Sequence, residues 1–179
     1  PLGAKNHLLA GNGLDASDKD SAINIATWPV NGLYMPDGIA SYLYRGNTYL
    51  VTANEGDARE YGDYEDPSRV KDVTLDLTAF PNRSDLRKDA NIGRLNIINT
   101  EGDFDNDGDF DALYAYGARS ISIWDAMCTQ VYDSGDTLEQ VTAARYPDHF
   151  NASHTNNTFD NRSDDKGPEP EAVEVGRLF

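Results

Sequence analysis

The sequence predicts an all-β fold of antiparallel strands, arranged as a sandwich, a barrel or the blades of a β-propeller. Short runs rich in β-branched and aromatic residues alternate in polarity, polar turns separate these runs, and stretches with helical periodicity are scarce. The 179 residues suffice for one domain with a core. We expect residues 1–179 to be a single partial propeller domain, a fragment of a larger propeller that is incomplete at both ends. No initiator Met opens the sequence, and "EAVEVGRLF" at its close has the character of a strand just beginning.

The sequence predicts a β-hairpin over residues 38–53. It follows residues 1–32, which are dense in Gly, Asn, Asp and Ser and are expected to be loop. In "GIASYLY", Ile39, Ser41 and Leu43 alternate with Ala and Tyr residues. "RGN" then supplies a turn, and "TYLVTA" supplies the second strand.

The rest of the chain predicts one short helix and several more strands. "SDLRKDA" is expected to be helical, with Ser84 or Asp85 as its N-cap. The further predicted strands are "GRLNIIN" (93–99), "ALYAYGARSISIWD" (112–125, broken at Gly117), "TQVYDSG" (129–135) and, after a polar loop over 147–170, "AVEV" (172–175).

Two segments far apart in the chain share a pattern that favours a propeller. "MPDGIASY" (35–42) and "EPEAVEVG" (169–176) both place a proline and an acid before a small residue, a β-branched residue and an alternating run. In a propeller such segments would be the innermost strands of two blades. Asp37 and Glu171 would then open these strands and face the central channel.

The composition of the chain indicates which classes of binding partner are unfavourable. The chain carries 31 acidic against 15 basic residues, for a formal net charge of -16, which disfavours nucleic acids and anionic membrane surfaces. No apolar run approaches the roughly 18 residues of a membrane span, so we expect no membrane insertion in this segment. The single cysteine, Cys128, excludes an intrachain disulfide and is expected to be a buried or incidental thiol. The three histidines lie in polar segments and are expected at the surface.

The strongest candidate site is the acidic loop "DFDNDGDFD". Carboxylates recur at alternate positions, at Asp103, Asp105, Asp107, Asp109 and Asp111. Ca²⁺ takes six to eight oxygen ligands, and Gly108 permits the tight turn that such a loop needs. Asp109 would contribute its backbone carbonyl. An EF-hand would require Glu where Tyr114 stands, so the loop suits a calcium site in a β-hairpin. The alternative is a solvated acidic turn.

A second candidate site is "NEGDAR", directly after the second strand of the hairpin. Glu55 and Asp57 could hold a divalent metal, together with Asp37 and Glu171, and Arg59 could clamp a phosphate or carboxylate. Asp37 and this loop should lie at the same end of the blade, because the second strand of a hairpin returns to where the first began. The alternative is a local network of ion pairs, to which Lys166 in "DDKGPEPE" could belong.

Weaker signals complete the inventory. "DASDKD" (15–20) could bind a cation but lacks a glycine at the right offset, so a solvated loop is favoured. N-x-S/T sequons, which would carry glycans in a eukaryotic secretory protein, occur at Asn82, Asn151, Asn156 and Asn161.

Several of these motifs together resemble the choice-of-anchor I family. They are "YMPDGIASY", "TYLVTANEGDAR", "RVKD", "LTAFPN", "DGDFDALYAYGARSISIWD", "VYDSGD" and "RSDDKGPEPEAVEVG", in order over the whole chain. The resemblance implies a β-propeller and an extracellular, cell-surface or periplasmic location, as in secreted or surface-anchored bacterial proteins and related cell-surface glycoproteins. Many members carry the label alkaline phosphatase, but the family supplies no established catalytic residues. "DAMCTQVYDSG" departs from the family pattern, which has a Gly/Asn-type turn and no cysteine there.

Two functions follow as hypotheses. The first is a metal-dependent phosphoesterase that acts on a small phosphate ester, with Glu55, Asp57 and Arg59 as catalytic groups and a second divalent metal beside Ca²⁺. The second is a non-catalytic, calcium-stiffened module that binds an extracellular or surface component. In both, the remainder of its own propeller would be a partner.

Overall fold

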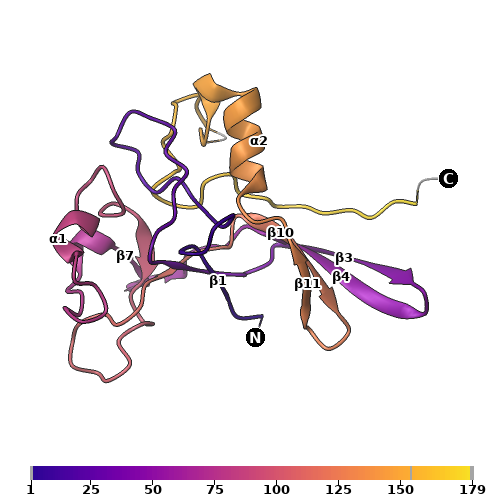
Figure 1. Ribbon diagram of the computed structural model, residues 1–179, viewed down its shortest axis with the longest axis horizontal. Helices are drawn as coiled ribbons and strands as arrows, with labels where there is room; N and C mark the ends of the chain where they lie inside the picture. Colours follow the sequence, from indigo (N-terminus) through magenta and orange to yellow (C-terminus); the bar gives the residue numbers. More distant parts are fainter. Residues whose placement is uncertain (1, 154, 178–179) are drawn as a thin grey trace.

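The computed structural model describes residues 2–153 and 155–177, and these are predominantly β (Figure 1). The strands are β1 (Ala4–Asn6), β2 (Asn31–Leu33), β3 (Gly38–Tyr44), β4 (Asn47–Asn54), β5 (Glu60–Tyr61), β6 (Tyr64–Glu65), β7 (Pro67–Arg69), β8 (Asn96–Ile98), β9 (Tyr114–Ala115), β10 (Ser120–Asp125) and β11 (Gln130–Asp133). Two α-helices, α1 (Arg83–Leu86) and α2 (Thr137–Arg145), and two 3₁₀ turns, Val70–Asp72 and Pro147–His149, complete the secondary structure of the described residues. None of these helices is long and apolar enough to cross a membrane.

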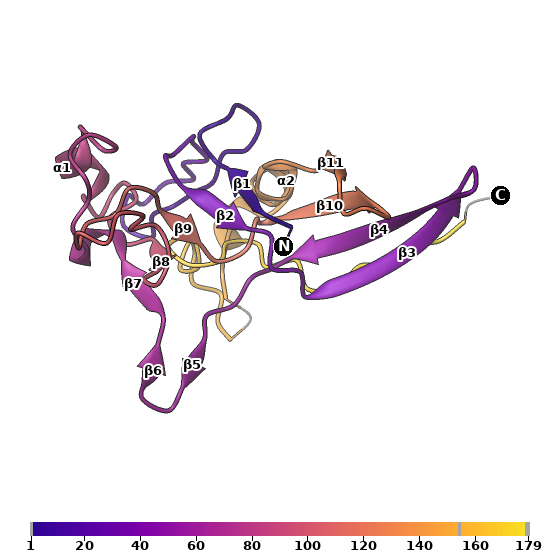
Figure 2. The ribbon, with the colours of Figure 1, turned by 90° about the horizontal axis from the view of Figure 1, so that it is seen from below.

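The predicted hairpin is confirmed and belongs to a four-stranded sheet. β3 pairs with β4 from Gly38↔Ala53 to Tyr44↔Asn47, and the sheet has the order β11-β10-β4-β3 with every pair antiparallel. The turn residues Arg45 and Gly46 have φ angles of 51° and 83°, the left-handed pair that a two-residue type I′ turn requires. Figure 2 shows this hairpin as a long arm in which β3 and β4 lie side by side.

A second sheet has five strands in the order β1-β2-β9-β8-β7. Its β2–β9 pair is parallel, with Asn31 opposite Tyr114, whereas the sequence predicted antiparallel pairing throughout. A parallel pair needs a long crossover connection, which the residues between β2 and β9 provide. The two-residue strands β5 and β6 form a separate ribbon that projects from the body (Figure 2).

The main hydrophobic core packs around the five-stranded sheet. Its buried members are Leu14, Ala16, Val30, Val70, Leu75, Phe80, Leu86, Ile92, Leu95, Ile97, Leu113 and Ala115. A smaller cluster of Tyr34, Ala118 and Trp124 packs on the four-stranded sheet, where the rings of Tyr34 and Trp124 meet edge to face at 4.9 Å. Each sheet therefore has its own buried apolar cluster.

The four-stranded sheet also buries a polar ladder. Asn54 donates to the hydroxyls of Ser120 (3.1 Å) and Ser122 (2.8 Å), and both serines donate to Asp133. Lys5, 3% exposed, completes the ladder with an ion pair to Asp133 at 3.0 Å. A buried polar group without a partner is costly, so this chain of bonds fixes the register of β4, β10 and β11.

Two sequence-based expectations about local structure were wrong, and one helix was missed. Residues 172–175 form no strand, because no described strand builds a ladder with them. The helix α2 was not predicted, although "TLEQVTAAR" consists mostly of helix-tolerant residues. His7 is 1% exposed rather than at the surface, and burial lowers its pKa to about 3. His154 lies outside the described residues.

Two further expectations concern the short helix near residue 84 and Cys128. The short predicted helix exists, but it spans only Arg83–Leu86, and Asn82 rather than Ser84 or Asp85 precedes it. Cys128 is exposed. The described residues form separate sheets, so the propeller arrangement itself stays a prediction.

Candidate functional site

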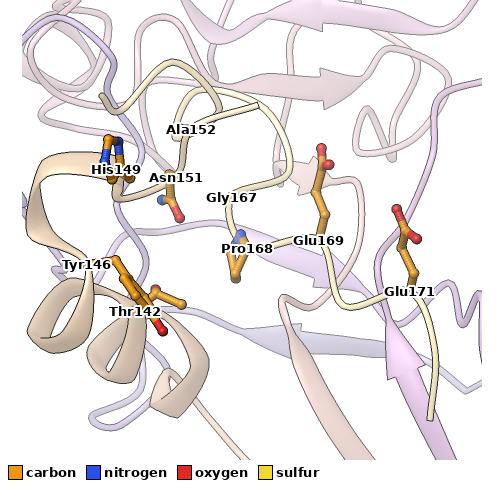
Figure 3. Close-up of a pocket in the computed structure, with 9 residues that line it drawn as sticks. All are labelled: Thr142, Tyr146, His149, Asn151, Ala152, Gly167, Pro168, Glu169 and Glu171. Atoms are coloured by element: carbon orange, nitrogen blue, oxygen red, sulfur yellow. The ribbon is translucent and has the colours of Figure 1, made fainter. Parts of the chain in front are cut away.

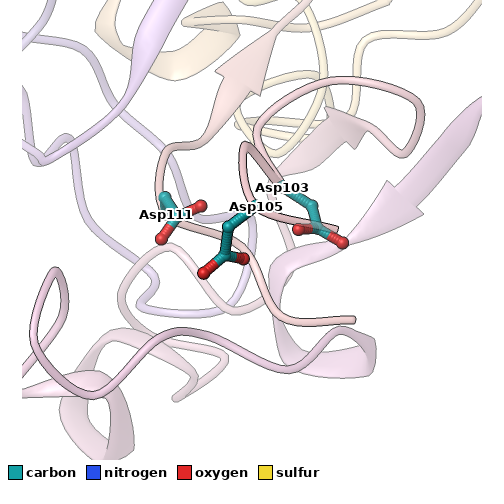
Figure 4. A group of neighbouring side chains, drawn as sticks. All are labelled: Asp103, Asp105 and Asp111. Carbon is teal, nitrogen blue, oxygen red and sulfur yellow. The ribbon is translucent and has the colours of Figure 1, made fainter. Parts of the chain in front are cut away.

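The acidic loop brings three of its five aspartates together. One carboxylate oxygen each from Asp103, Asp105 and Asp111 lies within 4.8 Å of the others, and Figure 4 shows Asp105 between the other two. Such separations fit oxygens around a cation with ligand distances of about 2.3 to 2.6 Å. Asp107 and Asp109 are not members of this group: the Asp107 side chain accepts the backbone N–H of Asp109 at 3.1 Å.

The loop is held by its own backbone and by a neighbouring segment. Asp111 and Ala112 both donate their N–H to the carbonyl of Gly102, and Gly108 donates to Asp103 Oδ2 at 3.1 Å. Gly108 has a φ of 98°, as the tight turn requires. Phe110 exchanges backbone hydrogen bonds with the segment around Leu75, which belongs to the main core. The carboxylates thus stand on a fixed frame.

The charges within the loop are unbalanced. The neighbouring Asp107 carboxylate raises the pKa of Asp105, and burial followed by the charge of Asp107 raises the pKa of Asp109. One oxygen of Asp103, Oδ1, is buried and has no hydrogen-bond partner among the described residues. A buried carboxylate oxygen without a donor is unfavourable, and a bound cation would satisfy it. The donor set therefore fits a calcium ion.

The "NEGDAR" loop is positioned by a tight backbone crossing. Gly56 and Gly117 both have positive φ, and a Cβ added to Gly56 would lie 2.0 Å from the backbone nitrogen of Gly117. Only glycines fit such an approach. The crossing sets the end of β4 against the link between β9 and β10.

Glu55 and Asp57 are neutralised by a residue from the C-terminal loop. Lys166 donates to Glu55 at 2.9 Å and to Asp57 at 3.3 Å. Burial alone would lower the pKa of Lys166, but the hydrogen bond to Glu55 and the charges of Glu169 and Asp57 outweigh it and raise the pKa. The two carboxylates are therefore held in ion pairs.

Arg59 points to a different partner. Its guanidinium bonds Asp66 at 2.7 Å and Thr100 at 3.3 Å, and Asp66 also accepts the hydroxyl of Tyr116 at 2.7 Å. Arg59 is not among the residues that line the cavities beside Glu55 and Asp57. Arg59 thus forms an ion pair with Asp66, a buried acid that the sequence analysis did not identify as a candidate.

The predicted metal ligands Asp37 and Glu171 lie near one another in the backbone but in different cavities. Asp37, Glu55 and Asp57 line one cavity of about 370 Å³, at the same end of the hairpin. Glu171 lines another, beside α2. The Glu171 carbonyl would lie 2.5 Å from a Cβ on Gly38, so the C-terminal segment passes the start of β3.

A third cavity joins the two motifs that the sequence set apart. About 430 Å³ in volume, it is lined from the "NEGDAR" side by Asp57 and Glu60 and from the C-terminal loop by Arg162, Asp165 and Lys166. The two motifs therefore meet in space. They meet through ion pairs between Lys166 and the carboxylates of Glu55 and Asp57, so these carboxylates are not unpaired.

The "DASDKD" loop is also drawn into the body rather than left in solvent. Asp15 is fully buried, and its oxygens accept the backbone N–H groups of Ser17 and Asn24. Asp18 bonds Arg94 at 2.5 Å. These acids are satisfied by donors, which the residue pattern could not show.

Comparison with known proteins gives one family and two relatives. The model of the choice-of-anchor I domain matches residues 1–178. Gigasin-3a of Magallana gigas is 41% identical over 97 residues, which cover 50% of this chain and 34% of that protein. A mesenchyme-specific cell surface glycoprotein of Strongylocentrotus purpuratus is 26% identical over 211 residues, which cover 98% of this chain and 27% of that protein. The chain thus spans about a third or less of these relatives. No solved structure matches.

Proposed function

The chain belongs to the choice-of-anchor I family, and we propose that it is a calcium-stiffened module of a secreted or cell-surface protein. The calcium site is supported by Oδ1 of Asp103, which is buried, has no hydrogen-bond partner among the described residues and belongs to a side chain beside the carboxylates of Asp105 and Asp111. The relative named as a cell surface glycoprotein supports the location. The four-stranded antiparallel sheet has the size and pairing of a propeller blade and supports that arrangement within a longer chain.

The role of the ion is structural in this proposal. The loop lies between β8 and β9 and contributes no residue to the cavities at Lys166 and Asp37, and its backbone is hydrogen-bonded to the segment around Leu75 in the main core. A bound calcium ion offsets the repulsion among the carboxylates and fixes the loop. The module would then present a rigid surface to an extracellular component.

Thermal unfolding of the full chain tests this proposal. Calcium at 100 times its Kd should raise the Tm by roughly 5 to 10 °C, since such binding stabilises a domain of this size by about 2.7 kcal/mol. Asp105→Asn should remove most of that rise and change little in chelator. Asp148→Asn, an exposed acid elsewhere, is the matched control and should keep the full rise. Equal Tm values with calcium and with chelator would refute a structural calcium site.

The phosphoesterase is a second proposal, and it rests on the cavity where Asp57 meets Arg162 and Lys166. Two cations beside acids could hold a phosphate ester. Lys166 would have to leave Glu55 and Asp57 before these could hold a metal, and Arg59 would have to leave Asp66, so the non-catalytic module is favoured. Hydrolysis of a chromogenic monoester, in calcium and then in chelator, decides the question. Activity that Arg59→Ala leaves unchanged would exclude the proposed role of Arg59.

A further inference from the structure

The outer edge of β3 is a long sheet edge without a partner strand. β3 ends the four-stranded sheet and pairs with β4 in one continuous register. Among the strands of the described residues, β4 alone forms a ladder with it. Figure 2 shows β3 along the margin of the hairpin arm. Such an edge presents a row of free backbone N–H and C=O groups, which is a template for another strand.

The C-terminal segment leaves this edge open. It passes over one face of the sheet, because the Glu171 carbonyl would lie 2.5 Å from a Cβ on Gly38, and a Cβ points out of the plane of the sheet. Figure 3 shows Glu169 and Glu171 on this segment, beside the pocket that the segment forms with α2. The backbone groups of the edge lie in the plane of the sheet, and the segment forms no ladder with them.

The other edges of the two larger sheets carry features that hinder pairing. β1 and β7 have three residues each, and they contain Lys5 and Pro67. β11 has four residues, and its pairing with β10 shifts register between Ile123 and Trp124. Short length, charge, proline and bulges are the usual protection of a sheet edge. β3 has seven residues without charge or proline, and it has no register shift, so its edge is unprotected.

The sequence of β3 is complementary to itself. When two copies of β3 lie antiparallel with Ser41 opposite Ser41, Ile39 of each copy faces Leu43 of the other. These two side chains are 62% and 73% exposed in the single chain, so the pairing buries apolar surface. On the other face, Ala40 lies opposite Tyr42, a small residue against a large one. Cross-strand pairs of this kind stabilise antiparallel sheets.

The charges that flank β3 are complementary in the same register. Asp37 of each copy lies beside Arg45 of the other, at both ends of the paired strands. Both side chains are exposed, and neither forms an ion pair with any residue that the structure describes. Two copies of a chain with a formal charge of -16 repel one another over most of their surface. An uncharged strand with opposite charges at its two ends therefore favours a second copy of the chain at this edge.

We propose that the β3 edge binds the β3 edge of a second copy, so that the two four-stranded sheets become one continuous antiparallel sheet. The contact has a two-fold axis at Ser41 and uses the same patch on both copies, as is usual in homodimers. Backbone hydrogen bonds supply the affinity, and the side-chain pairs fix the register. A small contact of this kind has a Kd on the order of 10 µM.

Sedimentation equilibrium of the full chain in calcium, in about 150 mM salt and at about 1 to about 300 µM protein, measures the oligomeric state. The average mass should rise with concentration from that of one chain toward that of two. Leu43→Lys places a charge on the β3 edge and should raise the Kd at least about tenfold. Val131→Lys is the matched control, because Val131 is 57% exposed on β11, the opposite edge of the same sheet. It should change the Kd less than about twofold.

Exchange of the flanking charges tests the register. Asp37→Arg sets arginine against arginine at both ends of the contact, and Arg45→Asp sets aspartate against aspartate. Each variant alone should raise the Kd about tenfold. An equimolar mixture of the two variants should dimerise as tightly as the parent chain, because each end then joins an arginine to an aspartate. Arg45→Asp is compatible with the φ of 51° in this turn, where aspartate is favoured.

Three results would overturn the proposal. These are a monomer at every concentration, equal effects of Leu43→Lys and Val131→Lys, and the absence of dimers in the mixture of the two charge variants. The first is the result expected if β3 instead lines the channel of a closed propeller. All four substituted residues are exposed, so the variants should fold, and circular dichroism verifies this.

Discussion

The Nζ atom of Lys166 lies 2.9 Å from Oε1 of Glu55, although 111 residues separate them in the chain. Lys166 is the only described residue that forms an ion pair with either Glu55 or Asp57. Both partners of the Glu55 pair are largely buried, with side chains 11% and 17% exposed. This contact fastens the C-terminal loop to the end of β4, and its removal leaves a carboxylate without its cation.

Lys166→Gln should therefore destabilise the protein by about 2 kcal/mol, the cost of losing hydrogen bonds to charged partners in a largely buried place. Urea unfolding of the full chain in calcium measures this change in the free energy of unfolding. Lys88→Gln is the control, because Lys88 pairs with Asp85 at the surface and its loss should cost less than about 0.5 kcal/mol. Equal effects of the two substitutions would contradict a structural role for Lys166.

Asp160 predicts a pH dependence of stability. Burial raises the pKa of Asp160 from 3.8 to about 7, and the negative charges of Asp15, Asp20 and Asp18 add to this rise. The hydrogen bond that Ser163 donates to Oδ1 of Asp160 acts in the opposite direction but is outweighed. The folded protein then holds a proton that the unfolded chain has lost between these pH values. The stabilisation is complete below pH 3.8 and is lost as the pH rises through about 7.

Asp160→Asn should remove this dependence. The variant should be more stable than the parent by about 2 kcal/mol at pH 8 and about equal to it at pH 4, as measured by urea unfolding. Asn tolerates the φ of 67° at this position. Asp148→Asn serves as the exposed control and should leave the pH profile of the parent unchanged. A parallel profile for Asp160→Asn would show that Asp160 is ionised in the folded protein.

Among these substitutions, we expect replacement of Arg119 to cause the largest loss in the free energy of unfolding. It is 4% exposed, bonds Glu139 at 2.7 Å, and donates to the carbonyls of Asp15, Ser163 and Asp165. Arg119→Met should cost at least about 3 kcal/mol, because it leaves the Glu139 carboxylate buried and unpaired. Adding Glu139→Leu should recover part of this loss in urea unfolding. A double variant less stable than Arg119→Met would show that the uncompensated charge is not the cause.

The local pattern of the sequence was enough for the hairpin and for the acidic loop. β3 and β4 have alternating residues and a turn that needs left-handed conformations, and the loop has aspartates around a glycine. Both signals lie within about a dozen residues. The pattern did not distinguish Asp107 and Asp109 from the three converging aspartates, because that depends on how the loop folds.

What the sequence could not supply are contacts between distant residues. In β10 Ser120 and Ser122 face inward, because Asn54 and Asp133 lie opposite them, and the alternating Ile121 and Ile123 are only half-buried. His7 is buried by such contacts too. The ion pairs of Lys166 and Arg59 also join distant segments, and no spacing within "NEGDAR" encodes them.

The order of strands in the four-stranded sheet has a consequence for how fast the protein folds. β3–β4 and β10–β11 are each local hairpins, but their union at β4–β10 must close the long loop over residues 55–119. Closing a long loop costs entropy before the pairing repays it, so this step should limit the rate. The acidic loop over residues 103–111 lies inside that segment, and if it binds the proposed calcium ion early, the freely moving chain becomes shorter. Calcium should then accelerate refolding as well as slow unfolding.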